Sequence, residues 1–354
     1  MSLIKIDSKI IGKTEPTFFI ADIAANHDGD IERAKDLIYL AAESGANAAK
    51  FQHFDAKTIV SDYGFKNLKN KLSHQKTWNK SIYSVYEDAS IDLNWTKTLK
   101  ETCDKANIIF FSTPYSLELV DHLKDYVPAY KIGSGDITWL EILEAIARTL
   151  KPLFLATGAS DMREVDVAVK TILQHNTKLC LMQCNTNYTG DIKNFNYVNL
   201  NVLKEFKNKY PDLILGLSDH TPGLSTTLGA VALGARVIEK HFTDNNNRLG
   251  PDHVFSMNPQ SWRDMVDRTR ELELSLGKSI KQVEENERET VIVQRRSIRV
   301  NKDLKKGSII NRKDIIVLRP CPEDAYQISE MNNILGNKLK RDINKGDYIK
   351  ASDI

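Results

Sequence analysis

The sequence has few cysteines and no long apolar run. Its four cysteines, Cys103, Cys180, Cys184 and Cys321, form no CxxC pair. This spacing argues against a disulfide framework or a zinc knuckle and favours a reduced compartment. The first residues, MSLIKIDSK, lack the apolar stretch of a signal peptide, and nowhere is there an uninterrupted apolar run of about 18 residues. We therefore expect a cytoplasmic protein with no membrane span.

An excess of charge of either sign is also missing. The 354 residues include 49 basic and 47 acidic side chains, which gives a net charge of +2. This balance predicts neither a nucleic-acid partner nor a membrane surface. The tail from Lys302 to Lys350 is locally rich in lysine, and we interpret it as a solvated surface. The length exceeds one ordinary domain, although an α/β barrel of about 250 residues uses most of it.

The sequence does contain eight short, nearly continuous apolar runs, each ending in polar residues or glycine. They are FFIADIA (18–24), AAKFQHF (48–54), IIFFSTP (108–114), AYKIGS (129–134), PLFLATG (152–158), LCLMQCN (179–185), LILGLSDH (213–220) and RVIEKHFT (236–243). Such runs are typical of strands that are buried on both faces.

Amphipathic stretches fill the gaps between these runs, most clearly at 31–45. Asp30 is the predicted N-cap of that helix and Gly45 its stop. Its apolar face comprises Ile31, Ala34, Leu37, Ile38 and Ala41. Eight such units predict an α/β fold, a closed (β/α)8 TIM barrel with its functional groups at the carboxyl ends of the strands. A doubly wound open sheet is the alternative, but no GxGxxG motif follows the first run.

Two segments fall outside this pattern. Residues 55–95 are polar and aromatic, and we expect an elaborated loop over the barrel mouth. After a barrel at 1–280, a charged linker or helix is predicted at 281–293 and a small β-rich domain at 294–354. That domain repeats itself, because NKDLKKGSIINRKDI (301–315) matches KRDINKGDYIKASDI (340–354) in phase. A unit this small buries little core and is expected to lean on the barrel or on a partner chain.

Polar residues at the ends of the predicted strands would meet at one barrel mouth. Lys50 and Lys131, together with several hydroxyls, suit an anionic ligand that carries phosphate. His220 and His241, from adjacent strands, suit a divalent transition metal such as Mn, Zn or Fe when a carboxylate and water complete the site. Each residue alone also has a structural explanation, as a packing histidine, a salt-bridged lysine or a turn hydroxyl. The pattern predicts a metal-dependent barrel enzyme acting on an anionic substrate.

The motifs at these strand ends resemble those of the sialic acid synthase family, whose members make nine-carbon 2-keto-3-deoxy acids. The matching stretches are IADIAANHDG, KFQHF, FFSTPY, AYKIGSGD, LATG, CNTNY, GLSDHT, VALGARVIEKHFT, GPDHVFSMNP and VLRP. They span nearly the whole chain in order. The repeated tail resembles the SAF, or antifreeze-like, domain that follows the barrel in that family.

The resemblance implies condensation of phosphoenolpyruvate (PEP) with an N-acylated mannosamine-type sugar, with release of phosphate. It implies catalytic roles for Asp22, His220 and His241, the two histidines holding a divalent metal: Mn²⁺, or alternatively Mg²⁺ or Co²⁺. The implied PEP-binding residues are Lys50, Lys131, Ser134, Thr157, Thr186 and Ser218. The implied sugar-binding residues are Gln52, Tyr115, Asp136, Tyr188, Asp252 and Arg319. It also implies a domain-swapped homodimer in which Arg319 reaches the active site of the other subunit.

Several residues depart from the family pattern. Asp22 and Asp136 stand where the family has glutamates, Tyr115 stands for a phenylalanine and Thr186 for an asparagine. Ala156 replaces a serine that contacts PEP, and CPED follows the VLRP motif in place of a turn that contains glycine. Because several of these changes fall on the sugar side, we expect PEP chemistry to be kept. The acceptor stays open: an N-acetylmannosamine, a diacetamido-dideoxy hexose leading to legionaminic- or pseudaminic-type acids, or another aldose.

Two other functions are compatible with the residues. In a pyruvate aldolase, Lys131 or Lys50 would form a Schiff base with the substrate. In a non-catalytic protein, the barrel would be a scaffold and the tail domain would bind a partner or a glycan. The presence of both histidines in this sequence disfavours the scaffold.

Overall fold

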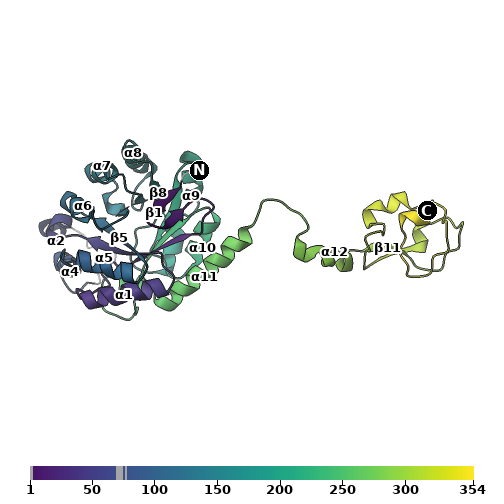
Figure 1. Ribbon diagram of the computed structural model, residues 1–354, viewed down its shortest axis with the longest axis horizontal. Coiled ribbons are helices and arrows are strands. Elements are labelled where there is room, and N and C mark those ends of the chain that lie inside the picture. The colour runs from purple at the N-terminus through teal and green to yellow at the C-terminus, as the bar shows by residue number, and fades with distance from the viewer. Residues whose placement is uncertain (1–2, 69–74, 76–77) are drawn as a thin grey trace. The chain divides into compact units, whose positions relative to one another are not determined.

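The computed structural model describes residues 3–68, 75 and 78–354. Contacts divide the chain into two compact units, Met1–Gly277 and Lys278–Ile354. Eight parallel strands close into a barrel in the first unit (Figure 1). They are β3 (Phe18–Asp22), β4 (Ala48–His53), β5 (Ile109–Pro114), β6 (Tyr130–Ile132), β7 (Leu153–Ala156), β8 (Leu179–Cys184), β9 (Ile214–Asp219) and β10 (Val237–His241). The predicted TIM barrel is confirmed.

Each strand lies within its predicted run and is shorter than it. The predicted run exceeds the strand by three residues at β6, β7 and β10; at β6 the run continues to residue 134. There the chain leaves the ladder after Ile132 and turns into a short 3-10 helix at Ser134–Asp136. The barrel closes where β10 pairs with β3, with His241 opposite Asp22 in the register. Two predicted functional residues therefore come together at the seam of the barrel.

Helices alternate with the strands and surround the barrel (Figure 1). They are α1 (Ile31–Glu43), α5 (Trp95–Lys105), α6 (Leu117–Leu123), α7 (Leu140–Arg148), α8 (Met162–Leu173), α9 (Val202–Lys209), α10 (Ser225–Ala232) and α11 (Pro259–Leu276). Helix α1 begins after Asp30, whose carboxylate accepts a hydrogen bond from the backbone N–H of Glu32 at 2.8 Å. The predicted apolar face is buried except at Ile31, which is only half-buried in the first turn.

An N-terminal hairpin closes the barrel at the amino ends of its strands. Its strands are β1 (Ile4–Ile6) and β2 (Lys9–Ile11), and the sequence pattern did not predict them. Three isoleucines of the hairpin join one buried cluster with Phe18, Ala48 and Ile109, the first residues of β3, β4 and β5. Because that end is filled with apolar side chains, the opposite end is left for polar groups.

The predicted insertion over the mouth contains helices of its own. They are α2 (Ala56–Ile59), α3 (Asp62–Asn67) and α4 (Ile82–Ala89). Residues 69–74, 76 and 77 of that insertion lie outside the described residues. The ring of Tyr86 in α4 lies 5.6 Å from the ring of Phe54, which directly follows β4. This contact fixes α4 against the carboxyl end of the barrel.

The second unit has the internal symmetry expected from its repeated sequence. It contains α12 (Arg288–Gln294), most of which lies in the predicted linker, and an antiparallel pair, β11 (Ser297–Val300) and β12 (Ile315–Leu318). Asp303 accepts a hydrogen bond from the backbone N–H of Lys345, and Asp342 accepts one from Lys306, both at 2.8 Å. The two halves of the repeat therefore cap each other's turns.

All four cysteines are free and buried, as expected for a chain without a disulfide framework. Within the ranges that the structure describes, no helix is long and apolar enough to cross a membrane.

The reciprocal caps of the second unit predict that replacing either aspartate lowers the protection of one backbone amide against hydrogen exchange. Asp303→Ala should free the Lys345 amide and destabilise that turn by about 1 kcal/mol, the contribution of one hydrogen bond. Asp342→Ala should do the same at Lys306. Hydrogen exchange of the full-length chain measures both amides, and Glu323→Ala, which removes an exposed carboxylate of the same unit, is the control. Unchanged exchange at both amides would contradict the reciprocal arrangement.

Candidate active site

Four charged side chains form a buried network at the carboxyl ends of the barrel strands. Lys50 Nζ on β4 lies 2.7 Å from Asp22 Oδ2 on β3. Lys131 Nζ on β6 lies 3.0 Å from Glu239 Oε1 on β10, and Lys50 Nζ is 3.9 Å from the same oxygen. Ser218 on β9 donates a hydrogen bond to that oxygen at 3.1 Å. The two lysines are only 2% and 3% exposed, so their partners are needed to keep them charged.

Asp22 connects this network to the imidazoles. Its Oδ2 accepts a hydrogen bond from Gln52 Nε2 at 3.2 Å and lies 3.5 Å from His241 Nε2, while Oδ1 accepts one from the backbone N–H of Ala24. Burial by itself raises the pKa of Asp22, but the charge of the neighbouring Lys50 holds it below its usual value. Asp22 is therefore an ionised carboxylate at neutral pH.

The two predicted imidazoles lie side by side, with ring centroids 5.4 Å apart. Nδ1 of His220 lies 2.9 Å from the carbonyl oxygen of Asn185, which favours the tautomer that carries its proton there. Burial lowers the pKa of His220, but Cys184 and the Asn185 carbonyl raise it above its ordinary value. Burial lowers the pKa of His241 to about 3, so His241 is neutral and able to bind a metal.

The donors at this point fit a divalent metal held in an open site. Nδ1 of His241 is buried without a hydrogen-bond partner among the described residues, and Oδ2 of Asp252 lies 3.7 Å from it. Two imidazoles beside carboxylates are a donor set that Mn²⁺, Zn²⁺ and Fe²⁺ accept. In the described part of the chain, no group of three or more His, Cys, Asp or Glu side chains is arranged so that it could hold a metal ion. A metal here would rely on water or substrate for its remaining ligands.

A second group of predicted residues gathers around Gly158, directly after β7. Its backbone N–H donates to Ser134 Oγ at 2.9 Å, and the neighbouring Thr157 hydroxyl donates to the Met182 carbonyl at 3.0 Å. A Cβ at Gly158 would lie 1.8 Å from Thr186 Oγ1 and 2.8 Å from Ser134 Oγ. Only glycine leaves room for these two hydroxyls beside its Cα, so Gly158 is required for this part of the site.

Aromatic rings cover the imidazoles on the outer side. Tyr188 lies 4.3 Å from His220 and Phe255 lies 4.9 Å from His241, measured between ring centroids. Tyr115 and Asp136 lie nearby, both half-buried, and burial raises the pKa of Tyr115 well above its ordinary value. Burial raises the pKa of Asp136 to about 6. Five of the predicted sugar-binding residues therefore lie at the barrel mouth: Gln52, Tyr115, Asp136, Tyr188 and Asp252.

Two other residues lie outside this mouth network. Asp219 points to the opposite face of β9, as the alternation of a strand predicts, and there it pairs with Lys240 at 2.5 Å and accepts a hydrogen bond from Thr226. Arg319 belongs to the second unit, where its side chain is exposed. Its role in another subunit stays a prediction.

The sequence reasoning placed Glu239 at a strand end but gave it no role, although it stands at the centre of the charge network. The sequence could have indicated a role for Glu239, because residues two apart on a strand share a face and Glu239 precedes His241 by two. Its Oε2 is buried and has no hydrogen-bond partner in the described chain. Phe255 was missed as an individual residue, although it lies in the motif GPDHVFSMNP.

Comparison with known proteins gives a consistent set of relatives. The model of the NeuB family matches residues 37–281, and that of the SAF domain matches residues 295–354. N,N'-diacetyllegionaminic acid synthase of Campylobacter jejuni is 37% identical over 310 residues, covering 86% of this chain and 91% of its own. The synthase of the same name from Legionella pneumophila is 35% identical over 344 residues, and the alignment covers 95% of this chain and 94% of that synthase. The crystal structure of N-acetylneuraminic acid synthetase from Leptospira borgpetersenii aligns with a TM-score of 0.71 at 29% identity, covering 82% of this chain and 95% of that one.

The buried network predicts a large stability loss when its central carboxylate is neutralised. Glu239→Gln should destabilise the barrel by about 3 kcal/mol, because it leaves the buried Lys131 ammonium without its acidic partner. Glu101→Gln, which breaks an exposed pair with Lys97 on α5, should cost less than about 1 kcal/mol. Urea unfolding of both variants measures the difference, and equal losses would contradict the network.

The raised pKa of Asp136 predicts a specific pH dependence of stability. The folded chain binds the Asp136 proton more tightly than the unfolded chain, so this residue contributes stability below about pH 4, which is lost as pH rises through about 6. Asp136→Asn cannot ionise, so its free energy of unfolding relative to that of the original chain should rise by about 3 kcal/mol as the pH increases from 4 to 7. Urea midpoints across this range test the effect, and a difference that does not vary with pH would contradict it.

Proposed function

The chain belongs to the NeuB family and ends in a SAF domain, and on that premise we propose that it synthesises a nonulosonic acid. The reaction condenses PEP with an N-acylated amino hexose and gives a nine-carbon 2-keto-3-deoxy acid and inorganic phosphate. The names of the two synthases from Campylobacter jejuni and Legionella pneumophila support a product of this class. The observation that carries the proposal is the pair of buried, charge-balanced lysines beside two imidazoles at one barrel mouth.

The lysines and the hydroxyls are proposed to bind PEP. Lys50 and Lys131 offer two fixed cations close to Ser218, a geometry that suits the phosphate and carboxylate of PEP. Ser134, Thr157 and Thr186 surround Gly158 and provide further polar contacts. Because their partners already hold these groups in place, little reorganisation is needed when the anion binds.

The aromatic side of the mouth is proposed to bind the open-chain sugar. Tyr188 lies against the imidazoles and offers an apolar face and a hydroxyl. Gln52, Tyr115, Asp136 and Asp252 supply donors and acceptors around it. His220 and His241 are the proposed metal ligands, for Mn²⁺ or alternatively Mg²⁺ or Co²⁺. A bound divalent metal supplies Lewis-acid polarisation of the sugar aldehyde.

The proposed reaction forms one carbon–carbon bond and breaks one carbon–oxygen bond. The C3 carbon of PEP attacks the aldehyde carbon, and water then adds at C2. The C2–O bond to phosphate breaks, phosphate leaves and the 2-keto group remains. Asp22, ionised in the free chain, takes the proton that the water releases and returns one to the new alkoxide. Lys50 and Lys131 stabilise the negative charge of the leaving phosphate.

The proposal includes an assembly of two chains. In a domain-swapped homodimer, the second unit of one chain lies over the barrel mouth of its partner, and Arg319 contacts the acceptor sugar there. The small apolar core of that unit, built around residues such as Ile310 and Ile349, supports its dependence on another surface.

The direct test follows phosphate release from PEP in the presence of Mn²⁺ and a panel of N-acyl hexosamines, with the product identified by mass. We expect release to require PEP, an acceptor and the metal. His220→Ala should lower kcat by at least about 100-fold, because one of the two protein ligands is lost. His175→Ala, which changes a histidine paired with Glu144 on the barrel surface, is the matched control and should retain activity. Activity that survives both chelator and His220→Ala would contradict the metal role.

Two further measurements, borohydride trapping and thermal unfolding, separate the proposed synthase from the aldolase and the scaffold. A Schiff-base aldolase needs a neutral lysine. Although burial lowers the pKa of Lys50, Asp22 and Glu239 hold it above its usual value. Borohydride should therefore fail to trap pyruvate on Lys50 or Lys131, and a trapped adduct with PEP inert would favour the aldolase. If PEP with Mn²⁺ does not raise the unfolding temperature, the scaffold function is favoured, because a bound ligand must stabilise the folded chain.

A further inference from the structure

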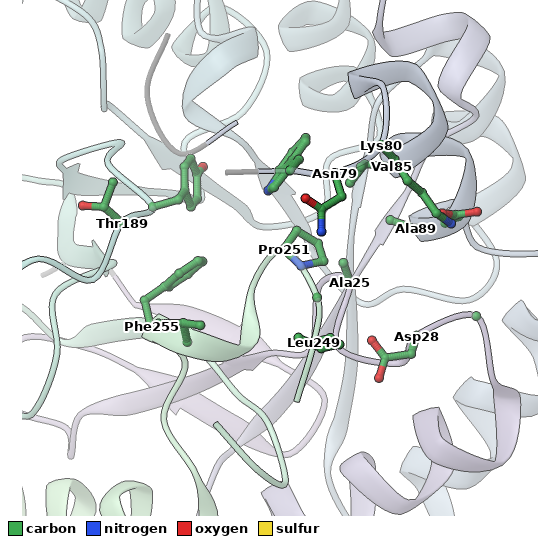
Figure 2. Close-up of a pocket in the computed structure, with 16 residues that line it drawn as sticks. Ala25, Asp28, Asn79, Lys80, Val85, Ala89, Thr189, Leu249, Pro251 and Phe255 are labelled. Atoms are coloured by element: carbon green, nitrogen blue, oxygen red, sulfur yellow. The ribbon is translucent and has the colours of Figure 1, made fainter. Parts of the chain in front are cut away.

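The rings of His220 and His241 have few hydrogen bonds that fix where their nitrogens point. Nδ1 of His220 lies 2.9 Å from the carbonyl oxygen of Asn185, whereas Nδ1 of His241 has no hydrogen-bond partner among the described residues. On the outer side lie the rings of Tyr188 and Phe255, which also line a pocket of about 1060 Å³ (Figure 2). Contacts between rings direct a nitrogen less sharply than a hydrogen bond does. The direction in which the two imidazoles point therefore depends on the backbone that carries them.

On the outer face of the barrel, a buried ion pair joins the two strands that carry these imidazoles. Lys240 Nζ lies 2.5 Å from Asp219 Oδ2, and the two residues stand directly opposite each other in the ladder of β9 and β10. Asp219 directly precedes His220, and Lys240 directly precedes His241. One ion pair therefore links the two strands immediately before both histidines.

The same two side chains hold the backbone on both sides of His220. Because β9 ends at Asp219, His220 itself lies beyond the strand. Asp219 Oδ1 accepts a hydrogen bond from the backbone N–H of Thr221 at 3.0 Å, and Lys240 Nζ donates one to the Thr221 carbonyl oxygen at 2.7 Å. Thr226 on α10 donates a further hydrogen bond from its hydroxyl to Asp219 Oδ2 at 2.5 Å. We call Asp219, Thr221, Thr226 and Lys240 the clasp.

The two charges of the clasp are almost completely buried. Asp219 is 4% exposed and Lys240 is 1% exposed, so water does not compete for their hydrogen bonds. A buried ion pair seldom stabilises a fold more than well-packed apolar side chains of the same size would. Stability alone therefore does not account for two charges at this place. Their hydrogen bonds to Thr221 have a direction that apolar contacts lack, and they fix the backbone around His220.

We propose that Asp219 and Lys240 are positioning residues, which align His220 and His241 so that both bind one metal ion. The inference rests on the proposed function, since the metal is the ligand that the two imidazoles share there. Neither side chain of the pair reaches the mouth, because both lie on the opposite face of their strands from the imidazoles. Their loss should weaken metal binding, since part of the binding free energy must then order the backbone around His220.

Mn²⁺ binding to the full-length chain without substrates measures this effect, followed by the electron paramagnetic resonance signal of free Mn²⁺. The double variant Asp219→Leu/Lys240→Met removes both charges together, so that neither is left buried alone. We expect its Kd for Mn²⁺ to rise by at least about tenfold. Its Kd for PEP, measured by calorimetry without metal, should change by less than about twofold, because Lys50 and Lys131 stand on other strands, β4 and β6.

The comparison of the two ligands separates positioning from general damage to the barrel. An unchanged Kd for Mn²⁺ in the double variant would overturn the inference, and so would an equal loss of affinity for Mn²⁺ and PEP. In both cases the original chain still binds Mn²⁺, and the proposed function stands. If the original chain itself binds no Mn²⁺, the proposed metal role fails and the inference fails with it.

Two neighbouring threonines of α10 provide a milder test that keeps both charges. Thr226→Val removes the hydroxyl that donates to Asp219 and should raise the Kd for Mn²⁺ by about threefold or more. Thr227→Val makes the same change at the next position, where the buried hydroxyl contacts Met265 Sδ at 3.4 Å, and should leave that Kd unchanged. Equal Kd values for these two variants would overturn the inference even where the double variant does not fold.

Discussion

Charge balance inside the barrel mouth is the constraint on which the rest of the structure depends. Two ammonium groups, Lys50 and Lys131, are buried where water cannot stabilise them, and two carboxylates, Asp22 and Glu239, neutralise them. An ammonium buried without such a partner costs several kcal/mol. The four groups therefore stabilise one another and hold two fixed cations at the place where we propose that the anion binds. Asp22 then extends the same network to His241, so the anion site and the imidazole pair are positioned together.

Strands and loops contribute differently to this site. The charged groups stand on β3, β4, β6 and β10, whose closed ladder leaves them little freedom. On the outer face of the barrel, Lys240 of β10 pairs with Asp219 of the neighbouring β9. The acceptor side is built from connecting segments, α4 and the chain before α11, which tolerate change without disturbing the barrel.

Much of the fold and part of the site could be predicted from the sequence. Runs buried on both faces gave the eight strands, and Asp30 marked the start of α1, because both signals are local. The hairpin of β1 and β2 was missed because strands of three residues carry too little periodicity. Glu239 was given no role because its partners, Lys50 and Lys131, stand on strands that are not neighbours of β10, so only barrel closure brings them together.

The most direct test of the central claim is a crystal structure of the chain with PEP and Mn²⁺. Our account predicts the phosphate and carboxylate of PEP within hydrogen-bond distance of Lys50, Lys131 and Ser218, and the metal on His220 and His241 beside it. PEP bound elsewhere, or pyruvate joined covalently to either lysine, would contradict the account.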